Sequence, residues 1–321
     1  MKRIERWARA DDAPIDYQRL KSRLAFLAER LYHDYEPTLA RGPQFVDRLT
    51  SWLDGAAEED DQRLMFELAG EIYFVGSMEM EQLYQDVLHG PIAWWLMEKA
   101  AVFDLSVDLD ARVEEAMGGT WFCPLTDSMQ IARFHHINNI AGKNLRPDWH
   151  TLARLGDPAR IAAYMEKEKL GRLVLLEDFV GSGSQASSAV KFIAEHLPEV
   201  PVLFAPLLIA PQGVKAVGEL LDELGGSIDF RPMLVLPQAC ILADSPLPDE
   251  SERHPRFRDL LENVDGLVRA PARTDPKESQ YGFGTVGALS VLFTNCPNNV
   301  LPLIHHTSDH WSPLFPRSVR K

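Results

Sequence analysis

Short apolar runs alternate with amphipathic stretches from Gly118 onward, and this alternation is the feature that most constrains the fold. The apolar runs predict buried strands near residues 120–124, 172–176, 200–210 and 228–237. The stretches between them predict helices over residues 129–142, 157–171, 186–197 and 211–226. Strands that alternate with helices at this spacing form a parallel sheet with helices on both faces. The sequence therefore predicts an α/β fold.

The first 117 residues predict a helical N-terminal region instead. Apolar residues recur there at intervals of three and four, which places them on one face of a helix. The recurring residues are Leu20, Leu24, Leu27 and Leu31 in one stretch and Leu64, Leu68, Ile72 and Val75 in another. We therefore expect two domains, at residues 1–117 and 118–321. Residues 244–284 are rich in proline and charge and predict a loop-rich lid or hood within the second domain.

The strand predicted at 172–176 runs into two adjacent acids, Glu177 and Asp178, and then into the small residues of "GSGS", Gly181–Ser184. Ligands of open parallel sheets bind beyond the carboxyl ends of the strands. Glycine amides, hydroxyls and a helix N-terminus suit a phosphate group. Carboxylates repel phosphate, but they suit the hydroxyls of a sugar or a Mg²⁺ ion between sugar and phosphates. This combination predicts a site for a ribose 5-phosphate compound.

The segment "LVLLEDFVGSGSQ" resembles the motif of type I phosphoribosyltransferases, in which four apolar residues and two acids precede a Thr-Gly-x-Thr turn. The resemblance implies that Glu177 and Asp178 contact the ribose of phosphoribosyl pyrophosphate, with Mg²⁺ held indirectly. It implies that the turn binds the 5-phosphate, and that "PLTDSMQ", Pro124–Gln130, holds pyrophosphate. The implied ligand-binding residues are Gly181, Ser182, Gly183, Ser184 and Gln185 in the turn, and Thr126, Asp127 and Ser128 after the first strand. Gln185 departs from the motif, and Gly181 stands where some members carry a catalytic Asp.

The region from Gly118 to Arg317 also resembles a narrower group, the phosphoribosyltransferase-like proteins predicted in bacterial conflict (anti-phage) systems. The similar stretches are "CPLTDS" after the first strand, "FTNCPNNVLPLIHH", and "WSPLFPR" near the end. A catalytic member would be a glycosyltransferase that transfers ribose 5-phosphate, with Glu177 and Asp178 stabilising the sugar cation. A non-catalytic member would sense a nucleotide and signal to a partner. Both interpretations stay open at this point.

Three other interpretations compete. The acid pair and its turn could cap a helix and serve only structure, as could Asp127 and Ser128. "EDFVGSGS" also resembles the S-adenosylmethionine loop of adenine-type DNA methyltransferases, but the next strand lacks the acid that such a cofactor site needs. The chain also has no Asn/Asp-Pro-Pro-aromatic catalytic motif. His305, His306 and His310 suggest a metal site with little support from other ligand residues.

The composition limits the partners and the cellular location that we expect for the protein. A net charge of −14 disfavours nucleic acid as a partner, because phosphate backbones are bound by clustered Lys and Arg. No 18-residue apolar stretch predicts a membrane span, and the first residues do not resemble a secretory signal. The three cysteines do not suggest a disulfide framework. We expect a cytoplasmic protein that binds phosphoribosyl pyrophosphate or a nucleotide, contacts a protein partner through its N-terminal helices, and forms a homodimer.

Overall fold

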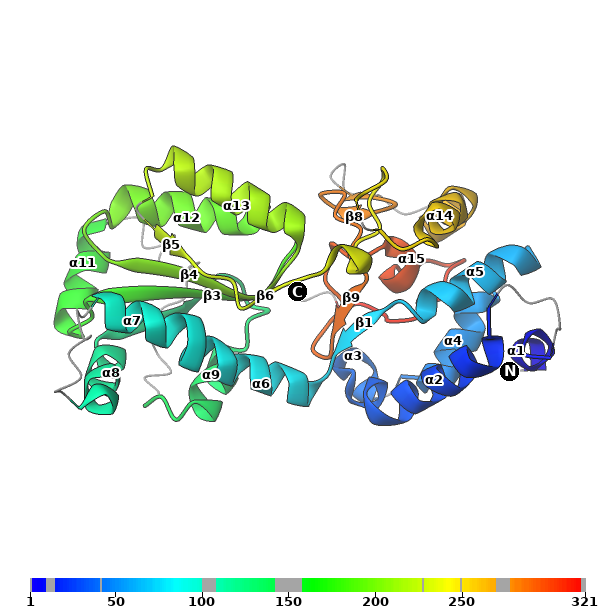
Figure 1. Cartoon of the computed structure of the whole chain (residues 1–321), viewed down its shortest axis with the longest axis horizontal. Helices are drawn as coiled ribbons and strands as arrows, with labels where there is room; N and C mark the ends of the chain where they lie inside the picture. The colour runs from blue at the N-terminus through cyan, green and yellow to red at the C-terminus, as the bar shows by residue number, and fades with distance from the viewer. Residues whose placement is uncertain are drawn as a thin grey trace. The chain divides into compact units, whose positions relative to one another are not determined.

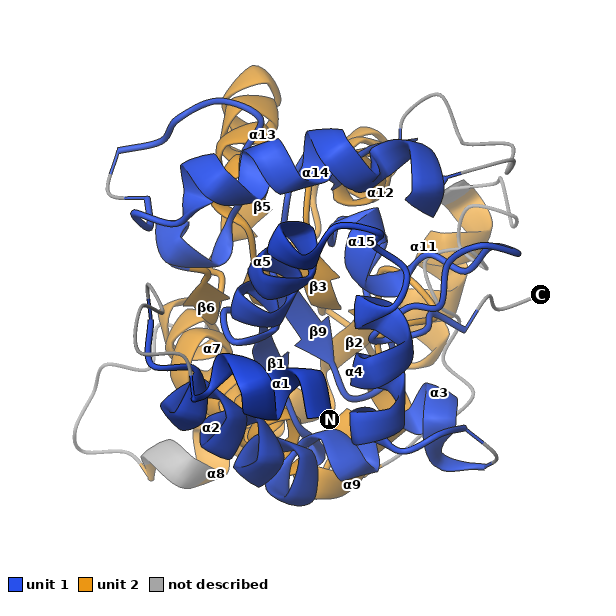
Figure 2. Ribbon diagram, turned by 90° about the vertical axis from the view of Figure 1, so that its right-hand side faces the viewer, with its two compact units in different colours: residues 1–77, 237–321 blue, residues 78–236 orange. Residues whose placement is uncertain are grey.

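The computed structural model describes residues 2–9, 15–40, 42–99, 108–141, 158–226, 228–248, 250–269 and 278–318. The chain divides into two compact units (Figure 2). Unit 1 combines Met1–Ser77 with Pro237–Lys321, and unit 2 is the continuous stretch Met78–Leu236. Unit 1 thus takes residues from both sides of the division expected at residues 117 and 118, and that division remains a sequence-based prediction.

Unit 2 is built on a five-stranded parallel sheet in the order β2-β3-β4-β5, with β6 pairing the far end of β4 (Figure 1). Its strands are β2 (Thr120–Pro124), β3 (Arg172–Val180), β4 (Val202–Ile209), β5 (Ile228–Phe230) and β6 (Leu234–Val235). Every residue of β2 and β4 is buried, as expected for parallel strands that are covered on both faces. The sheet confirms the predicted α/β class.

The helices of unit 2 cover both faces of this sheet. They are α6 (Ser77–Val87), a π-helical turn (Leu88–Ile92), α7 (Ala93–Lys99), α8 (Leu109–Gly118), α9 (Ile131–Ile137), α11 (Pro158–Lys167), α12 (Ser184–His196) and α13 (Pro211–Glu223). Figure 1 shows α12 and α13 on one face of the sheet and α7 and α9 on the other. Apolar side chains of α11, α12 and α13 share one core with the strands, which includes Ile161, Ala189 and Val217. This two-sided burial fixes the sheet that carries the acid pair.

Unit 1 is mainly helical and includes a two-stranded parallel pair. Its elements are α1 (Lys2–Trp7), α2 (Tyr17–Arg30), a 3₁₀ turn (Tyr32–Asp34), α3 (Glu36–Leu39), α4 (Phe45–Leu53), α5 (Glu59–Ala69), β1 (Tyr73–Val75), a second 3₁₀ turn (Gln238–Cys240), α14 (His254–Val268), β7 (Glu278–Ser279), β8 (Gly282–Phe283), β9 (Ser290–Leu292) and α15 (Pro302–His305). Strand β1 pairs with β9. Segments from the two ends of the sequence therefore share one core.

The strand β1 corrects the helix that the leucine periodicity predicts through Ile72 and Val75. Helix α5 ends at Ala69 with Gly70 as its C-cap, and Tyr73–Val75 then pairs with Ser290–Leu292. Aromatic and β-branched residues favour a strand where a partner is present. That partner lies more than 200 residues away along the chain, so local periodicity gave no sign of it. The rest of the N-terminal region is helical, as predicted.

The predicted lid or hood, residues 244–284, contains helix α14 and the short hairpin β7–β8 within unit 1. Whether it acts as a lid stays a prediction. No helix within the described ranges combines the length and the apolar composition that a membrane span requires.

Candidate functional site

The acid pair lies where β3 extends beyond its neighbour. Strand β2 ends at Pro124, opposite Leu176, and the amide of Leu125 donates the last ladder bond to the Leu176 carbonyl at 2.8 Å. On the other side, β3 stays paired with β4 as far as Val180. Glu177 and Asp178 therefore lie inside β3, not after its end as the sequence predicts. The predicted strand was too short because an apolar run marks burial, whereas pairing with β4 continues through the acids.

A network of hydrogen bonds joins the acid pair to the loop after β2. The Thr126 amide donates to Glu177 Oε2 at 3.0 Å, and its hydroxyl donates to Glu177 Oε1 at 2.6 Å. The Ser128 hydroxyl lies 2.7 Å from Asp178 Oδ1 and 3.3 Å from Glu177 Oε1. Asp178 Oδ1 also accepts from the amide of Phe179 at 2.8 Å. Residues about 50 positions apart in sequence are thus brought together at the end of β2.

Burial sets the electrostatics of this network. Glu177 is 4% exposed and Asp178 is 5% exposed. Loss of hydration raises the pKa of Glu177 well above its usual value, and the neighbouring Asp178 raises it further. The hydrogen bonds from Thr126 and Ser128 act in the opposite direction but are weaker causes. Two neighbouring carboxyl groups that are shielded from solvent favour a shared proton, a bound cation or a set of ligand hydroxyls.

The turn after β3 leads directly into α12. Gly183 precedes the helix with φ +80°, a left-handed conformation that glycine adopts without strain. Helix α12 begins at Ser184, two residues earlier than predicted, so Ser184 and Gln185 lie in its first turn. These two side chains are exposed, and Ser182 is half-buried. The Ser182 and Ser184 hydroxyls lie 3.0 Å apart. The turn therefore offers hydroxyls and first-turn amides at a helix N-terminus, a setting suited to an anion.

Gly213 in the first turns of α13 positions this loop, and the sequence analysis missed it. A Cβ atom built on Gly213 would lie 2.6 Å from the Gly181 carbonyl oxygen and 3.2 Å from Val180 Cγ1. The Ala210 amide just before α13 also donates to the Val180 carbonyl at 2.8 Å. Helix α13 thus approaches the turn closely only because Gly213 has no side chain. A glycine inside a predicted helix is the only sign of such a close approach in the sequence, and it is not specific, because Gly218 in the same helix has open space around it.

Besides the acid pair in β3, the predicted site residues lie in the loop after β2 and in the segment that joins β3 to the first turn of α12. Thr126 and Ser128 contact the acid pair directly, and Asp127 between them is exposed. Gly181 and Gly183 are buried in the turn that continues from the same strand as the acids. The alternative role of Ser128 as a cap of α9 is not seen, because α9 begins at Ile131 after Gln130 and has no side-chain cap. Ligand binding by these residues stays a prediction.

The histidines of the C-terminal tail form no metal site among the described residues. His305 in α15 is buried, and its Nε2 lies 3.1 Å from the Val300 carbonyl oxygen. Burial lowers the pKa of His305 to about 3. No group of three or more His, Cys, Asp or Glu side chains within the described ranges is arranged to hold a metal ion. His305 is best explained as a packed core residue.

Comparison with protein families shows the family to which the chain belongs, although it does not test the role of the acid pair. The model of the PRTase-CE family, phosphoribosyltransferases of conflict systems, matches residues 49–317. The chain belongs to this family. The match begins within α4 and covers α5 and β1 of unit 1, all of unit 2 and nearly all of the C-terminal part of unit 1. Searches of curated proteins and of solved structures found no match. Family membership indicates a phosphoribosyltransferase-like protein of conflict systems, and it does not identify the substrate.

Proposed function

We propose that this PRTase-CE protein binds a ribose 5-phosphate compound, phosphoribosyl pyrophosphate or a nucleotide, at the ends of β2 and β3. The proposal is based on the hydrogen-bond network that joins Thr126 and Ser128 to Glu177 and Asp178. It brings the loop after β2 and the acid pair to one place, directly before the turn Gly181–Gln185. In a phosphoribosyl site these three parts take the pyrophosphate, the ribose hydroxyls and the 5-phosphate.

Because the two acids are buried, a sugar that binds them must replace the hydrogen-bond donors that they already have. The hydroxyls of Thr126 and Ser128 donate to the two carboxylates. Ribose carries two neighbouring hydroxyls that offer the same kind of donor. Binding would therefore exchange side-chain hydroxyls for ribose hydroxyls, so that few buried acceptors lose a partner. The loop after β2 would shift with this exchange.

Mg²⁺ fits the donor set at this place, because the carboxylate oxygens of Glu177 and Asp178 are the hard ligands that it prefers. Two protein carboxylates are too few for a complete octahedral site. The acid pair would hold the ion together with the phosphates of the bound ligand. Its contribution would be to neutralise phosphate charge beside the acid pair.

The reaction class implied by the family is transfer of ribose 5-phosphate with release of pyrophosphate. In such a step Glu177 and Asp178 would stabilise positive charge on the sugar ring. The second candidate function is a non-catalytic nucleotide sensor in bacterial defence. It is favoured by Gly181, which is buried and offers no side chain where some phosphoribosyltransferases carry a catalytic Asp.

Calorimetry tests the proposal. Phosphoribosyl pyrophosphate with Mg²⁺ and a panel of nucleotides would be titrated into the full chain and into the double variant Glu177→Gln/Asp178→Asn. We expect binding by the wild type and a loss of at least about tenfold in affinity for the variant, because each lost charge-assisted hydrogen bond contributes about 1.5–3 kcal/mol. Release of pyrophosphate that depends on an added base would establish transfer. Binding without release would establish the sensor.

The matched control is the exposed acid pair at the end of α13, changed as Asp222→Asn/Glu223→Gln. It removes the same charge from the same unit and should leave affinity unchanged. Equal affinity in both double variants, or no binding of any phosphoribosyl ligand by the wild type, would refute the proposal. Binding of S-adenosylmethionine alone would favour the methyltransferase interpretation.

A further inference from the structure

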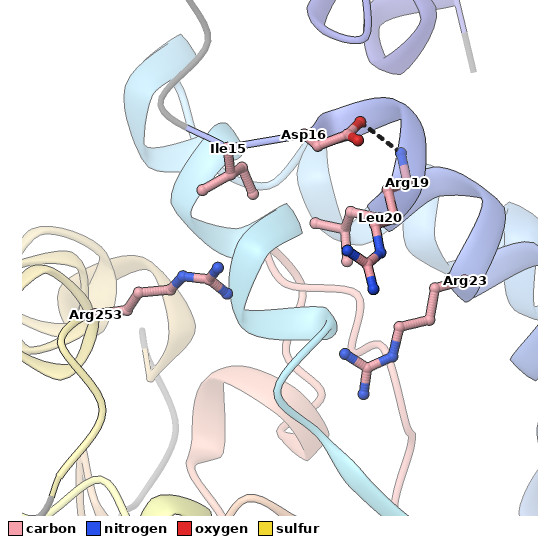
Figure 3. Close-up of a pocket in the computed structure, with 6 residues that line it drawn as sticks. All are labelled: Ile15, Asp16, Arg19, Leu20, Arg23 and Arg253. Carbon is pink, nitrogen blue, oxygen red and sulfur yellow. Dashed lines mark hydrogen bonds between the residues drawn. The ribbon is translucent and has the colours of Figure 1, made fainter.

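A pocket of about 570 Å³ lies within unit 1, apart from the elements that carry the acid pair. It is lined by Ile15, Asp16, Arg19, Leu20, Arg23 and Arg253. Its volume is in the range of pockets that hold small molecules. Figure 3 shows Arg253 on one side of the view and Arg19 and Arg23, both from α2, on the other. Three cationic side chains thus share one concave space.

The sequence places these side chains together by simple geometry. Arg19 and Arg23 are four residues apart in α2, so they project from one face of the helix. Asp16 caps this helix by accepting from the Arg19 amide at 2.8 Å. Leu20 lies between them and packs against α5, where a Cβ on Gly70 would lie 2.5 Å from Leu20 Cδ1. The helix is therefore fixed at its start and seated on α5, which holds the two arginines in place.

Two of the three positive charges that line the pocket have no paired acid among the residues that the structure describes. Arg253 pairs with Glu71. The guanidinium groups of Arg19 and Arg23 form no hydrogen bond or ion pair with any described residue. The lining residues carry three positive charges and one negative charge, and that negative charge, on Asp16, is engaged at the helix cap. This arrangement is unusual in a chain with 47 acids and 33 Lys and Arg residues, where carboxylates are abundant.

We propose that this pocket binds a small phosphate-bearing anion, at a second site that is independent of the phosphoribosyl site in unit 2. Guanidinium groups bind phosphate oxygens in a bidentate manner, and Arg is the side chain suited to this contact. Arg19 and Arg23 supply two guanidinium groups that pair with no described residue, and Arg253 adds a third positive charge to the lining. The described lining residues include no aromatic side chain on which a base could stack, so recognition rests on the phosphates.

Inorganic pyrophosphate is the probe, and hydrogen exchange measured by mass spectrometry on the full chain locates its binding. We expect pyrophosphate to slow exchange in peptides from the first turns of α2, residues 15–23. The double variant Arg19→Gln/Arg23→Gln should lose this protection and bind at least about tenfold more weakly at this site. Arg253→Gln should have a smaller effect, because Arg253 is already paired with Glu71.

The control variant Arg30→Gln/Lys215→Gln removes the same charge at two exposed positions outside the pocket and should keep the protection. Peptides that cover residues 177–187 report separately on the unit 2 site. Failure of the phosphoribosyl proposal would leave them unprotected without changing the result at α2. No protection of residues 15–23 at saturating pyrophosphate, or equal protection in the Arg19/Arg23 variant, would overturn the second site.

Discussion

The two compact units are assembled in opposite ways. Unit 2 is one continuous stretch of chain, and its sheet neighbours β2, β3, β4 and β5 follow one another in sequence. Unit 1 joins the two ends of the sequence, and its parallel pair connects β1 with β9. The candidate phosphoribosyl site therefore depends on local connections along the chain. The core of unit 1, in contrast, cannot form until the whole chain is present.

Several contacts show how strongly the first part of unit 1 depends on the last. The Trp52 indole donates to the Leu303 carbonyl at 2.7 Å, and the Tyr35 hydroxyl donates to the Pro316 carbonyl at 2.8 Å. The buried Arg48 donates through Nε to the Leu314 carbonyl at 2.8 Å. The ring of Phe315 packs among aromatic residues from the first part, including Tyr32 at 5.2 Å between centroids. Removing the C-terminal stretch would expose all these groups.

The largest effect is therefore expected from truncation after Leu236. Residues 1–77 should lose protection from hydrogen exchange and become sensitive to protease, because β1, Arg48 and Trp52 lose their partners. The fragment 78–236 by itself should unfold in a single cooperative thermal transition, since its sheet and helices are complete. Protected residues 1–77 in the truncated chain, or a fragment 78–236 without cooperative unfolding, would contradict the comparison.

A smaller effect is expected inside unit 2, at the contact between α13 and the turn after β3. Gly213→Ala should lower the free energy of unfolding by about 1–3 kcal/mol, the usual cost of overpacking, because the new methyl would meet the Gly181 carbonyl at 2.6 Å. It should also weaken phosphoribosyl pyrophosphate binding. Chemical denaturation and calorimetry measure the two effects.

Gly218 in the same helix is the control, because a Cβ there would meet nothing within 4 Å. Gly218→Ala should stabilise the protein by up to about 1 kcal/mol through helix propensity alone. Equal changes in the two variants would show that α13 does not hold the turn.

The smallest effect concerns protonation of Glu177. Burial and Asp178 raise its pKa in the folded protein, so over the pH range between the ordinary and the raised pKa the folded state holds a proton that the unfolded state has lost. Stability then falls as pH rises through this range, by at most about 1.4 kcal/mol per pH unit for one proton. Glu177→Gln removes this titration, so the variant should gain stability over the wild type as pH rises. Unfolding by urea at several pH values measures the difference.

The variant Glu223→Gln, at an exposed position, controls for general charge effects. Its free energy of unfolding should change with pH in the same way as that of the wild type. A constant difference between Glu177→Gln and the wild type at all pH values would mean that the acid pair ionises normally in the fold.

The comparison also explains what the sequence could predict. The parallel sheet of unit 2 was predicted because each strand and each covering helix leaves a local pattern, and consecutive strands become neighbours. The closeness of Thr126 and Ser128 to Glu177 and Asp178 follows from the same rule, since parallel neighbours end at one edge. Pairing of β1 with β9 leaves no local pattern, so Ile72 and Val75 were assigned to a helix. The extension of β3 through the acids was missed because it depends on β4.

Some features needed coordinates because they rest on contacts between separate elements. The arginines of α2 show a helical spacing in the sequence, but Arg253 joins them only through the folding of unit 1. Gly213 is an ordinary helix glycine until the Gly181 carbonyl lies beside it. The burial of Glu177 could not be predicted either, because its sequence neighbours do not show that the loop after β2 lies against it.

In the proposed binding mode, the acid pair exchanges the hydroxyls of Thr126 and Ser128 for those of a ribose. A crystal structure with phosphoribosyl pyrophosphate and Mg²⁺ tests it most directly. We predict a phosphate against the turn Gly181–Gln185 and ribose hydroxyls within hydrogen-bond distance of Glu177 and Asp178. A ligand bound elsewhere, with both carboxylates still held by Thr126 and Ser128 alone, would contradict the claim.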